Sequence, residues 1–123
     1  VSDRQAVFNL LHTLNAANIR PNIVINNAGI AKPGPFTSLQ VERVMAVNCL
    51  AHFWLLQAFL PGLSPDGHVV CMASCLGLGA VPYLADYCAS KAAVIALCES
   101  LRLEFPWLTV TVLCPFLVVQ TRL

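Results

Sequence analysis

A tyrosine and a lysine spaced four residues apart, Tyr87 and Lys91, point most directly to chemistry in this 123-residue sequence. On a helix, that spacing places both side chains on one face, one turn apart. A free tyrosine has a pKa of about 10, and lowering it to about 7 requires roughly 4 kcal/mol. One unit charge about 4 Å away supplies about that much at an effective dielectric constant near 20. The pair is therefore a candidate acid/base, and the alternative is a packed aromatic ring beside a surface lysine.

A serine precedes this pair at a position where parallel sheets bind ligands. Ser74 follows the apolar run at residues 68–72, which reads as a buried strand. The carboxyl ends of parallel strands form ligand crevices. The Ser74 hydroxyl can hold a substrate oxygen that receives the tyrosine proton. The alternative is an ordinary turn residue.

Helical and strand patterns alternate along the chain. A capping box at Ser2 to Gln5 opens an amphipathic helix that ends near Asn18. The β-branched run 23–25 has no polar interruption, which is typical of a strand buried on both faces. A second capping box, at Thr37 to Gln40, opens a long apolar helix. The remaining expected elements are this helix at about 38–60, a strand at 68–72, a helix at about 86–105 and a strand at 109–113.

This alternation is typical of right-handed parallel crossover units, so the expected fold class is α/β with a doubly wound parallel sheet. Three strands are fewer than usual for such a fold. An apolar parallel strand at an open edge invites association, which suggests that neighbouring strands have been lost.

Composition argues against several classes of function. The net charge is +1 and the basic residues are scattered, so no electrostatic footprint for nucleic acid or anionic lipid is present. The sequence contains no run of about 18 unbroken apolar residues, so no membrane span is expected. The six cysteines include no CxxC pair and read as reduced core thiols in a reducing compartment, with a disulfide framework or metal site as the alternative. The three histidines share no metal-ligand spacing, and no metal site is expected.

Five landmarks in order resemble the short-chain dehydrogenase/reductase family. They are Asn26-Asn27-Ala28-Gly29, Asn48, Ser74, the Tyr87-Cys88-Ala89-Ser90-Lys91 segment and Cys114-Pro115. The resemblance implies that Tyr87 is the general acid/base and that Lys91 lowers its pKa and holds the nicotinamide ribose. It also implies that Ser74 positions the substrate oxygen and that Asn48 anchors a proton-relay water. For Asn48, the alternative is a satisfied amide of the protein core.

The resemblance further implies a dinucleotide cofactor, NAD or NADP. Its expected contacts are Asn27, Ala28, Gly29, Tyr87, Lys91, Pro115 and Val118. The glycine-rich turn that cradles the phosphates is absent. The expected architecture is therefore a Rossmann-like doubly wound parallel sheet that is truncated to its C-terminal catalytic half. Residues 1–123 would form one partial domain without the first strands.

Finer similarity concerns the segments 51–54, 58–61 and 114–118, which look like the branch of retinol dehydrogenases and 17-beta-hydroxysteroid dehydrogenases. This implies a lipophilic alcohol or ketone substrate, which suits the apolar loop 76–84, and a homodimer in the full-length form. It also implies an intracellular protein on the cytoplasmic side of the endoplasmic reticulum membrane or lipid droplets, attached only through segments outside this sequence. The alternative is a catalytically inactive truncated isoform that acts by associating with another subunit.

Overall fold

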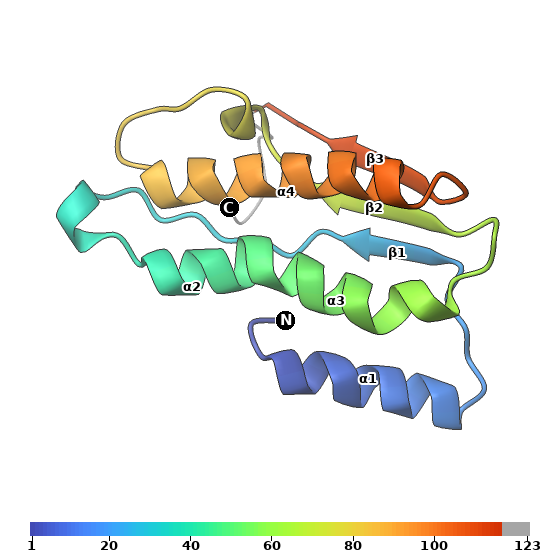
Figure 1. Ribbon diagram of the computed structural model, residues 1–123. Coiled ribbons are helices and arrows are strands. Elements are labelled where there is room, and N and C mark those ends of the chain that lie inside the picture. The colour runs from blue at the N-terminus through green and yellow to red at the C-terminus, as the bar shows by residue number, and fades with distance from the viewer. Residues whose placement is uncertain (117–123) are drawn as a thin grey trace.

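Three parallel strands lie side by side in the order of the sequence in the computed structural model, which describes residues 1–116 (Figure 1). They are β1 (Ile23–Asn26), β2 (His68–Met72) and β3 (Thr109–Leu113). The predicted bounds of β2 and β3 are confirmed. Both strands are runs rich in β-branched residues, which favour extended backbone.

Long helices precede and connect these strands. The central one is continuous over Val41–Gly62 and contains a π-helical turn in its middle. Along the chain the helical segments are α1 (Arg4–Ala16), α2 (Val41–Met45), the π turn (Ala46–Leu50), α3 (Ala51–Phe59) and α4 (Ala85–Glu104).

The helix starts differ slightly from the predicted ones. Asp3, not Ser2, caps α1, and its carboxylate accepts a hydrogen bond from the Gln5 backbone at 2.8 Å. The central helix begins at Val41 because Phe36–Ser38 forms a separate 3-10 turn before it. α4 ends just before Phe105 and Pro106, as expected from the inability of proline to continue a helix.

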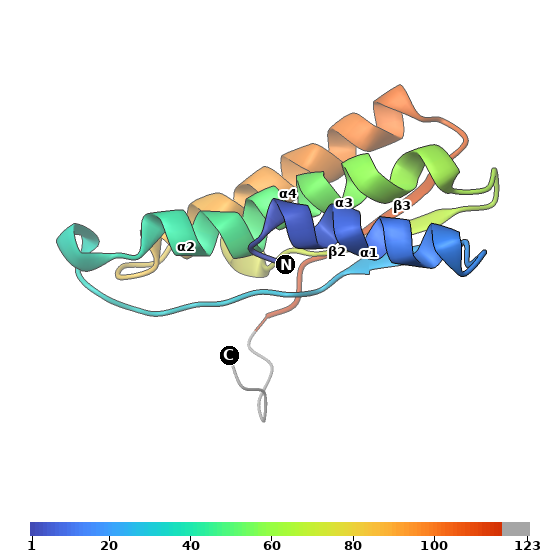
Figure 2. The same ribbon diagram turned by 90° about the horizontal axis from the view of Figure 1, so that it is seen from below.

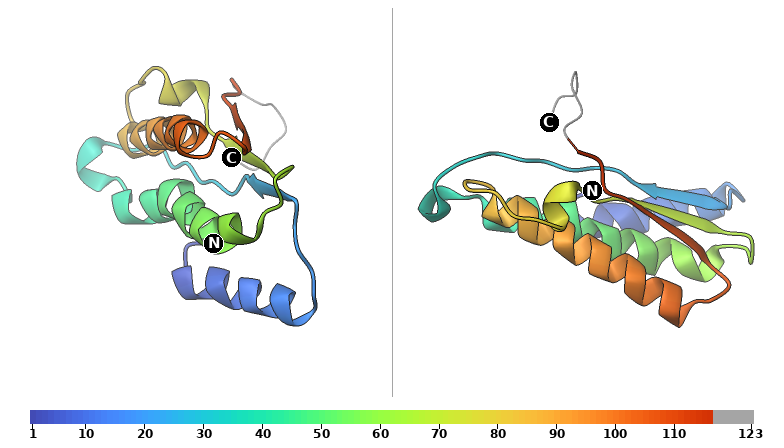
Figure 3. Two further views of the ribbon diagram at one scale, coloured as in Figure 1. Left: turned by 45° about the vertical axis from the view of Figure 1, so that its right-hand side comes forward. Right: turned by 90° about the horizontal axis from the view of Figure 1, so that it is seen from above.

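The helices lie on one face of the sheet, which corrects the predicted fold class (Figures 2 and 3). In a doubly wound sheet the strand order reverses, so crossover helices fall on both faces. Here the order β1-β2-β3 advances in one direction, and right-handed connections keep the helices together. The prediction of a doubly wound sheet is therefore wrong for the described residues 1–116. The structure is a Rossmann-like three-stranded parallel sheet with one helical layer.

The one-sided arrangement also changes the expected burial of β1. Val24 and Asn26 point toward the helices and are buried, whereas Ile23 and Ile25 are 51% and 63% exposed. The strand is thus buried on one face and not on both, because the helices cover only that face.

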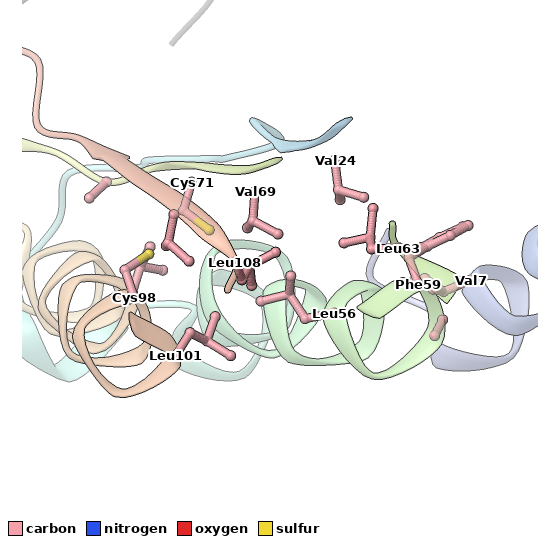
Figure 4. Packing of buried hydrophobic residues seen from close by; sticks show 14 residues of the cluster. Val7, Val24, Leu56, Phe59, Leu63, Val69, Cys71, Cys98, Leu101 and Leu108 are labelled. Atoms are coloured by element: carbon pink, nitrogen blue, oxygen red, sulfur yellow. The ribbon is translucent and has the colours of Figure 1, made fainter. Parts of the chain in front are cut away.

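The core fills the space between the helices and the sheet (Figure 4). Val69 and Cys71 from β2 meet Val94 and Cys98 from α4, and all four are fully buried. All six cysteines are free, and four of them are buried as small core residues.

The helix Val41–Gly62 is, by length and composition, apolar enough to cross a membrane. It packs in this structure against α1, α4 and β1. A core helix has the same composition, because its apolar residues are needed on more than one side.

Candidate active site

The predicted site residues follow the carboxyl ends of the strands. Asn27 to Gly29 follow β1, Ser74 follows β2 and Pro115 follows β3. Backbone hydrogen bonds hold two of these segments together, from Ala73 N to Leu113 O at 2.8 Å and from Cys75 N to Pro115 O at 3.0 Å. Parallel pairing thus brings distant parts of the sequence to one edge.

Tyr87 lies half-buried in the first turn of α4. The Asp86 carboxylate accepts a hydrogen bond from the Tyr87 backbone N–H at 2.8 Å, as expected for an acidic residue at a helix N-terminus. The Ser90 hydroxyl donates to the Tyr87 carbonyl at 2.7 Å. These two contacts fix the backbone that carries the phenol ring.

Lys91 is buried beside Tyr87, with only 3% of its surface exposed. Its Nζ lies 5.7 Å from the centroid of the Tyr87 ring and donates to the Met72 carbonyl at 2.7 Å. Burial lowers the pKa of Lys91, because desolvation penalises the ammonium, and the nearby Cys71 thiol opposes that effect. The alternative of a surface lysine is therefore wrong, since the side chain is held at the end of β2.

Gly29 borders the site on the side of β1. A Cβ at this position would lie 3.4 Å from Lys91 Nζ and 3.6 Å from Asn48 Oδ1. The absence of a side chain therefore leaves room beside the ammonium. Asn27 and Ala28 are exposed at the same turn, where a ligand has access to them.

Asn48 is fully buried in the π-helical turn, and its amide contacts two other segments. Its Oδ1 accepts from Ile30 N at 2.8 Å, and its Nδ2 donates to Ile30 O at 2.8 Å and to Ser90 Oγ at 3.2 Å. This is the geometry of a satisfied core amide, the alternative that the sequence left open. The anchoring of a proton-relay water by Asn48 stays a prediction.

Ser74 is buried at the start of the 3-10 turn Cys75–Gly77. Its Oγ accepts from Leu76 N at 3.2 Å, so the side chain caps this turn. That bond uses a lone pair of the hydroxyl and not its proton. The positioning of a substrate oxygen by Ser74 remains compatible with this geometry and stays a prediction.

Two other predicted cofactor contacts lie toward the end of the chain. Pro115 is half-buried at the edge formed by the strand ends, whereas Val118 lies outside the described residues.

Sequence reasoning missed three participants. Ser90 joins the Tyr87 backbone to the Asn48 amide, and its spacing of three residues from Tyr87 was the available signal. The Met72 carbonyl holds Lys91, and His52 is 2% exposed under the same edge. Both depend on contacts between distant segments, which no local pattern indicates.

Comparison with known proteins places this arrangement among dehydrogenases. Residues 1–123 match the sequence model described as short chain dehydrogenase. Because that match covers the whole chain, it does not assign the chain to a C-terminal half, and that part of the predicted fold class is withdrawn.

The curated relatives are named as short-chain dehydrogenases/reductases or retinol dehydrogenases. Short-chain dehydrogenase/reductase family 16C member 6 of Bos taurus is 35% identical over 95% of this chain and 40% of its own length. Retinol dehydrogenase 10 of Homo sapiens is 39% identical over 79% of this chain and 31% of its own length. The chain thus spans well under half the length of these relatives.

Solved structures show the same fold. A 4-hydroxyisoleucine dehydrogenase complexed with NADH and succinate has a TM-score of 0.90 and 31% identity, covering 99% of this chain and 61% of that one. An alcohol dehydrogenase from the archaeon Thermococcus sibiricus, complexed with 5-hydroxy-NADP, has a TM-score of 0.88 and 24% identity, covering 95% of this chain and 52% of that one.

Proposed function

Because the chain belongs to the short-chain dehydrogenase family, we propose that its protein is an NAD(P)-dependent oxidoreductase that interconverts an alcohol and its aldehyde or ketone. The observation that carries this proposal is the buried Lys91 ammonium, which lies beside the Tyr87 ring and next to the open position at Gly29. The structure of a relative with NADH supports the choice of cofactor class.

The residues present fit a dinucleotide at this edge. The space beside Gly29 would be filled by any side chain, and Lys91 offers ammonium donors to ribose hydroxyls there. The residues that would hold the cofactor are Asn27, Ala28, Gly29, Tyr87, Lys91, Pro115 and Val118. When bound, the nicotinamide supplies the hydride chemistry.

The protein itself handles the proton. In alcohol oxidation the Tyr87 oxygen accepts the hydroxyl proton while the carbonyl double bond forms, and in reduction Tyr87 returns it. Ser74 would hold the reacting oxygen with its hydroxyl proton, and Lys91 places its positive charge beside the Tyr87 ring. Asn48 and Ser90 keep this geometry by tying α4 and the central helix to Ile30.

The proposed substrate is a lipophilic alcohol, retinol-like or steroid-like. The retinol dehydrogenases among the relatives support this class. The loop before Tyr87 is apolar and presents Leu78, Val81 and Tyr83 to solvent, which suits contact with an apolar molecule.

Replacing Tyr87 by Phe tests the proposal in the complete protein. We expect kcat with retinol or a 17β-hydroxysteroid to fall by about 10²–10⁴-fold, because only the proton-transferring hydroxyl is lost. Binding of NADH or NADPH, followed by fluorescence titration, should change by less than about threefold. The Thr13→Val variant, which removes a hydroxyl on the exposed surface of α1, is the control and should keep its turnover.

Two outcomes would contradict parts of this assignment. Substantial turnover by Tyr87→Phe would remove Tyr87 from the acid/base role. A wild-type protein that neither binds NAD(P)H nor turns over would favour the alternative of an inactive protein that acts by association with another subunit.

We also propose a homodimer. In support, Leu50 and Phe53 expose apolar surface on the central helix, and a hollow of about 420 Å³ lies between the loop 76–81 and small residues of α4. Size-exclusion chromatography with light scattering tests this proposal, and a Phe53→Glu variant should shift the protein toward monomer.

The proposed location is the cytoplasmic side of the endoplasmic reticulum membrane or of lipid droplets. The similarity to retinol dehydrogenases supports it. Imaging of a tagged protein against markers of both compartments tests it, and a uniformly diffuse signal would contradict it.

A further inference from the structure

A small pocket lies under the carboxyl end of β1, between this strand and the central helix. Its volume is about 60 Å³. Mainly apolar residues line it, and three polar residues, Asn26, Asn27 and His52, interrupt that lining. The lining residues are Val1, Ile25, Asn26, Asn27, Ala28, Val47, Ala51, His52 and Leu55.

Two of these polar side chains, those of Asn26 and His52, are buried and are each 2% exposed, whereas Asn27 is exposed. The Asn26 Nδ2 donates to Cys71 Sγ at 3.7 Å, which leaves its Oδ1 as a free acceptor. Within residues 1–116, no protein group forms a hydrogen bond of good geometry with Asn26 Oδ1 or with either ring nitrogen of His52, although the backbone of Asn26 lies close to the His52 ring. Leaving a buried polar group unpaired costs about 1–3 kcal/mol, so two such groups at one pocket require an explanation.

The charge state of His52 limits what can occupy the pocket. Burial and, to a smaller extent, the nearby Lys91 ammonium together lower the pKa of His52 to about 4, although the adjacent backbone of Asn26 partly opposes them. At neutral pH the ring is therefore uncharged, with one donor nitrogen and one acceptor nitrogen. An additional cation would be repelled by Lys91, and an anion would face the Asn26 oxygen.

We propose that this pocket is a hydration site, in which the buried side chains of Asn26 and His52 hold one or two water molecules. One water donates to the Asn26 oxygen and to the acceptor nitrogen of His52, and a second water can accept from the donor nitrogen of the His52 ring. Each water occupies about 30 Å³ in the liquid, so the pocket has room for one or two. The bound water joins the end of β1 to α3, directly behind the turn at Asn27.

A crystal structure of the protein at about 1.8 Å resolution or better tests the site directly. We expect a water peak within hydrogen-bonding distance of both Asn26 Oδ1 and a ring nitrogen of His52. An empty pocket, or a ring turned to bond a protein group, overturns the proposal.

Thermal denaturation of variants tests whether the water couples the two side chains. We expect Asn26→Val and His52→Leu each to lower Tm by about 3–6 °C, because each leaves the other polar group with fewer partners. The double variant should lose less than the sum of the two. His52→Gln, which keeps a donor and an acceptor, should lose less than His52→Leu.

A pocket without water predicts the opposite changes in Tm. If the pocket holds no water, each substitution removes an unpaired buried group, so Tm should rise or stay constant and the two effects should add. If a variant does not fold, the crystal structure of the unmodified protein still decides the question.

Discussion

Acid should destabilise this protein through His52 over a defined pH range. In the unfolded chain His52 has a pKa near 6.5, and burial in the folded protein lowers it to about 4. A histidine whose folded pKa is lowered contributes stability that is complete above pH 6.5. This contribution is lost as the pH falls toward 4, because only the unfolded chain takes up the proton in that interval.

The size of the effect follows from the shift. A difference of about 2.5 pKa units corresponds to about 3 kcal/mol at 1.36 kcal/mol per unit. Domains of this kind are stable by only about 5–15 kcal/mol, so this loss is large enough to measure.

Urea denaturation followed by circular dichroism between pH 7 and pH 4 measures this loss. The His52→Gln variant cannot titrate at this position, so its difference from the unmodified protein cancels the contribution of the carboxylates. We expect the unmodified protein to lose about 3 kcal/mol of unfolding free energy relative to the His52→Gln variant as the pH falls from 6.5 to 4. His12→Gln, on the exposed surface of α1, is the matched control.

Parallel loss of stability in the unmodified protein and the His52→Gln variant would refute this reasoning. A His52 ring that titrates near 6.5, as observed by NMR of the folded protein, would refute it as well, because the ring would then be solvated.

Three further predictions concern the same edge of the sheet. Asn48→Leu should lower the free energy of unfolding by about 2–4 kcal/mol in urea denaturation, because it leaves both backbone groups of Ile30 without their partner. Gly77→Ala should cost about 1–3 kcal/mol in the same assay, since its Cβ would lie 2.8 Å from the Lys91 carbonyl carbon, whereas Gly79→Ala meets no atom within 4 Å and should be neutral. Burial lowers the pKa of Lys91 below 10.5, so the unfolded chain holds more protons than the folded protein as the pH rises toward 10.5; stability relative to Lys91→Met should therefore increase over that rise, and a constant difference would contradict this.

The sequence alone determined the elements and the position of the candidate site along them. The strands His68–Met72 and Thr109–Leu113 and the helix before Pro106 follow from local preferences of neighbouring residues. The expectation that Ser74 lies at the carboxyl end of a strand needed only the alternation of helices and strands.

Only the tertiary structure decided which face of each element is covered and which groups meet. The one-sided helical layer depends on the direction in which successive strands add, and it leaves Ile23 and Ile25 exposed despite their apolar run. The hydrogen bonds of Lys91 with Met72 and of Asn48 with Ile30 join residues that are 19 and 18 positions apart. Local propensity acts over one or two turns of chain, whereas these contacts and the burial of His52 arise only when separate segments pack together.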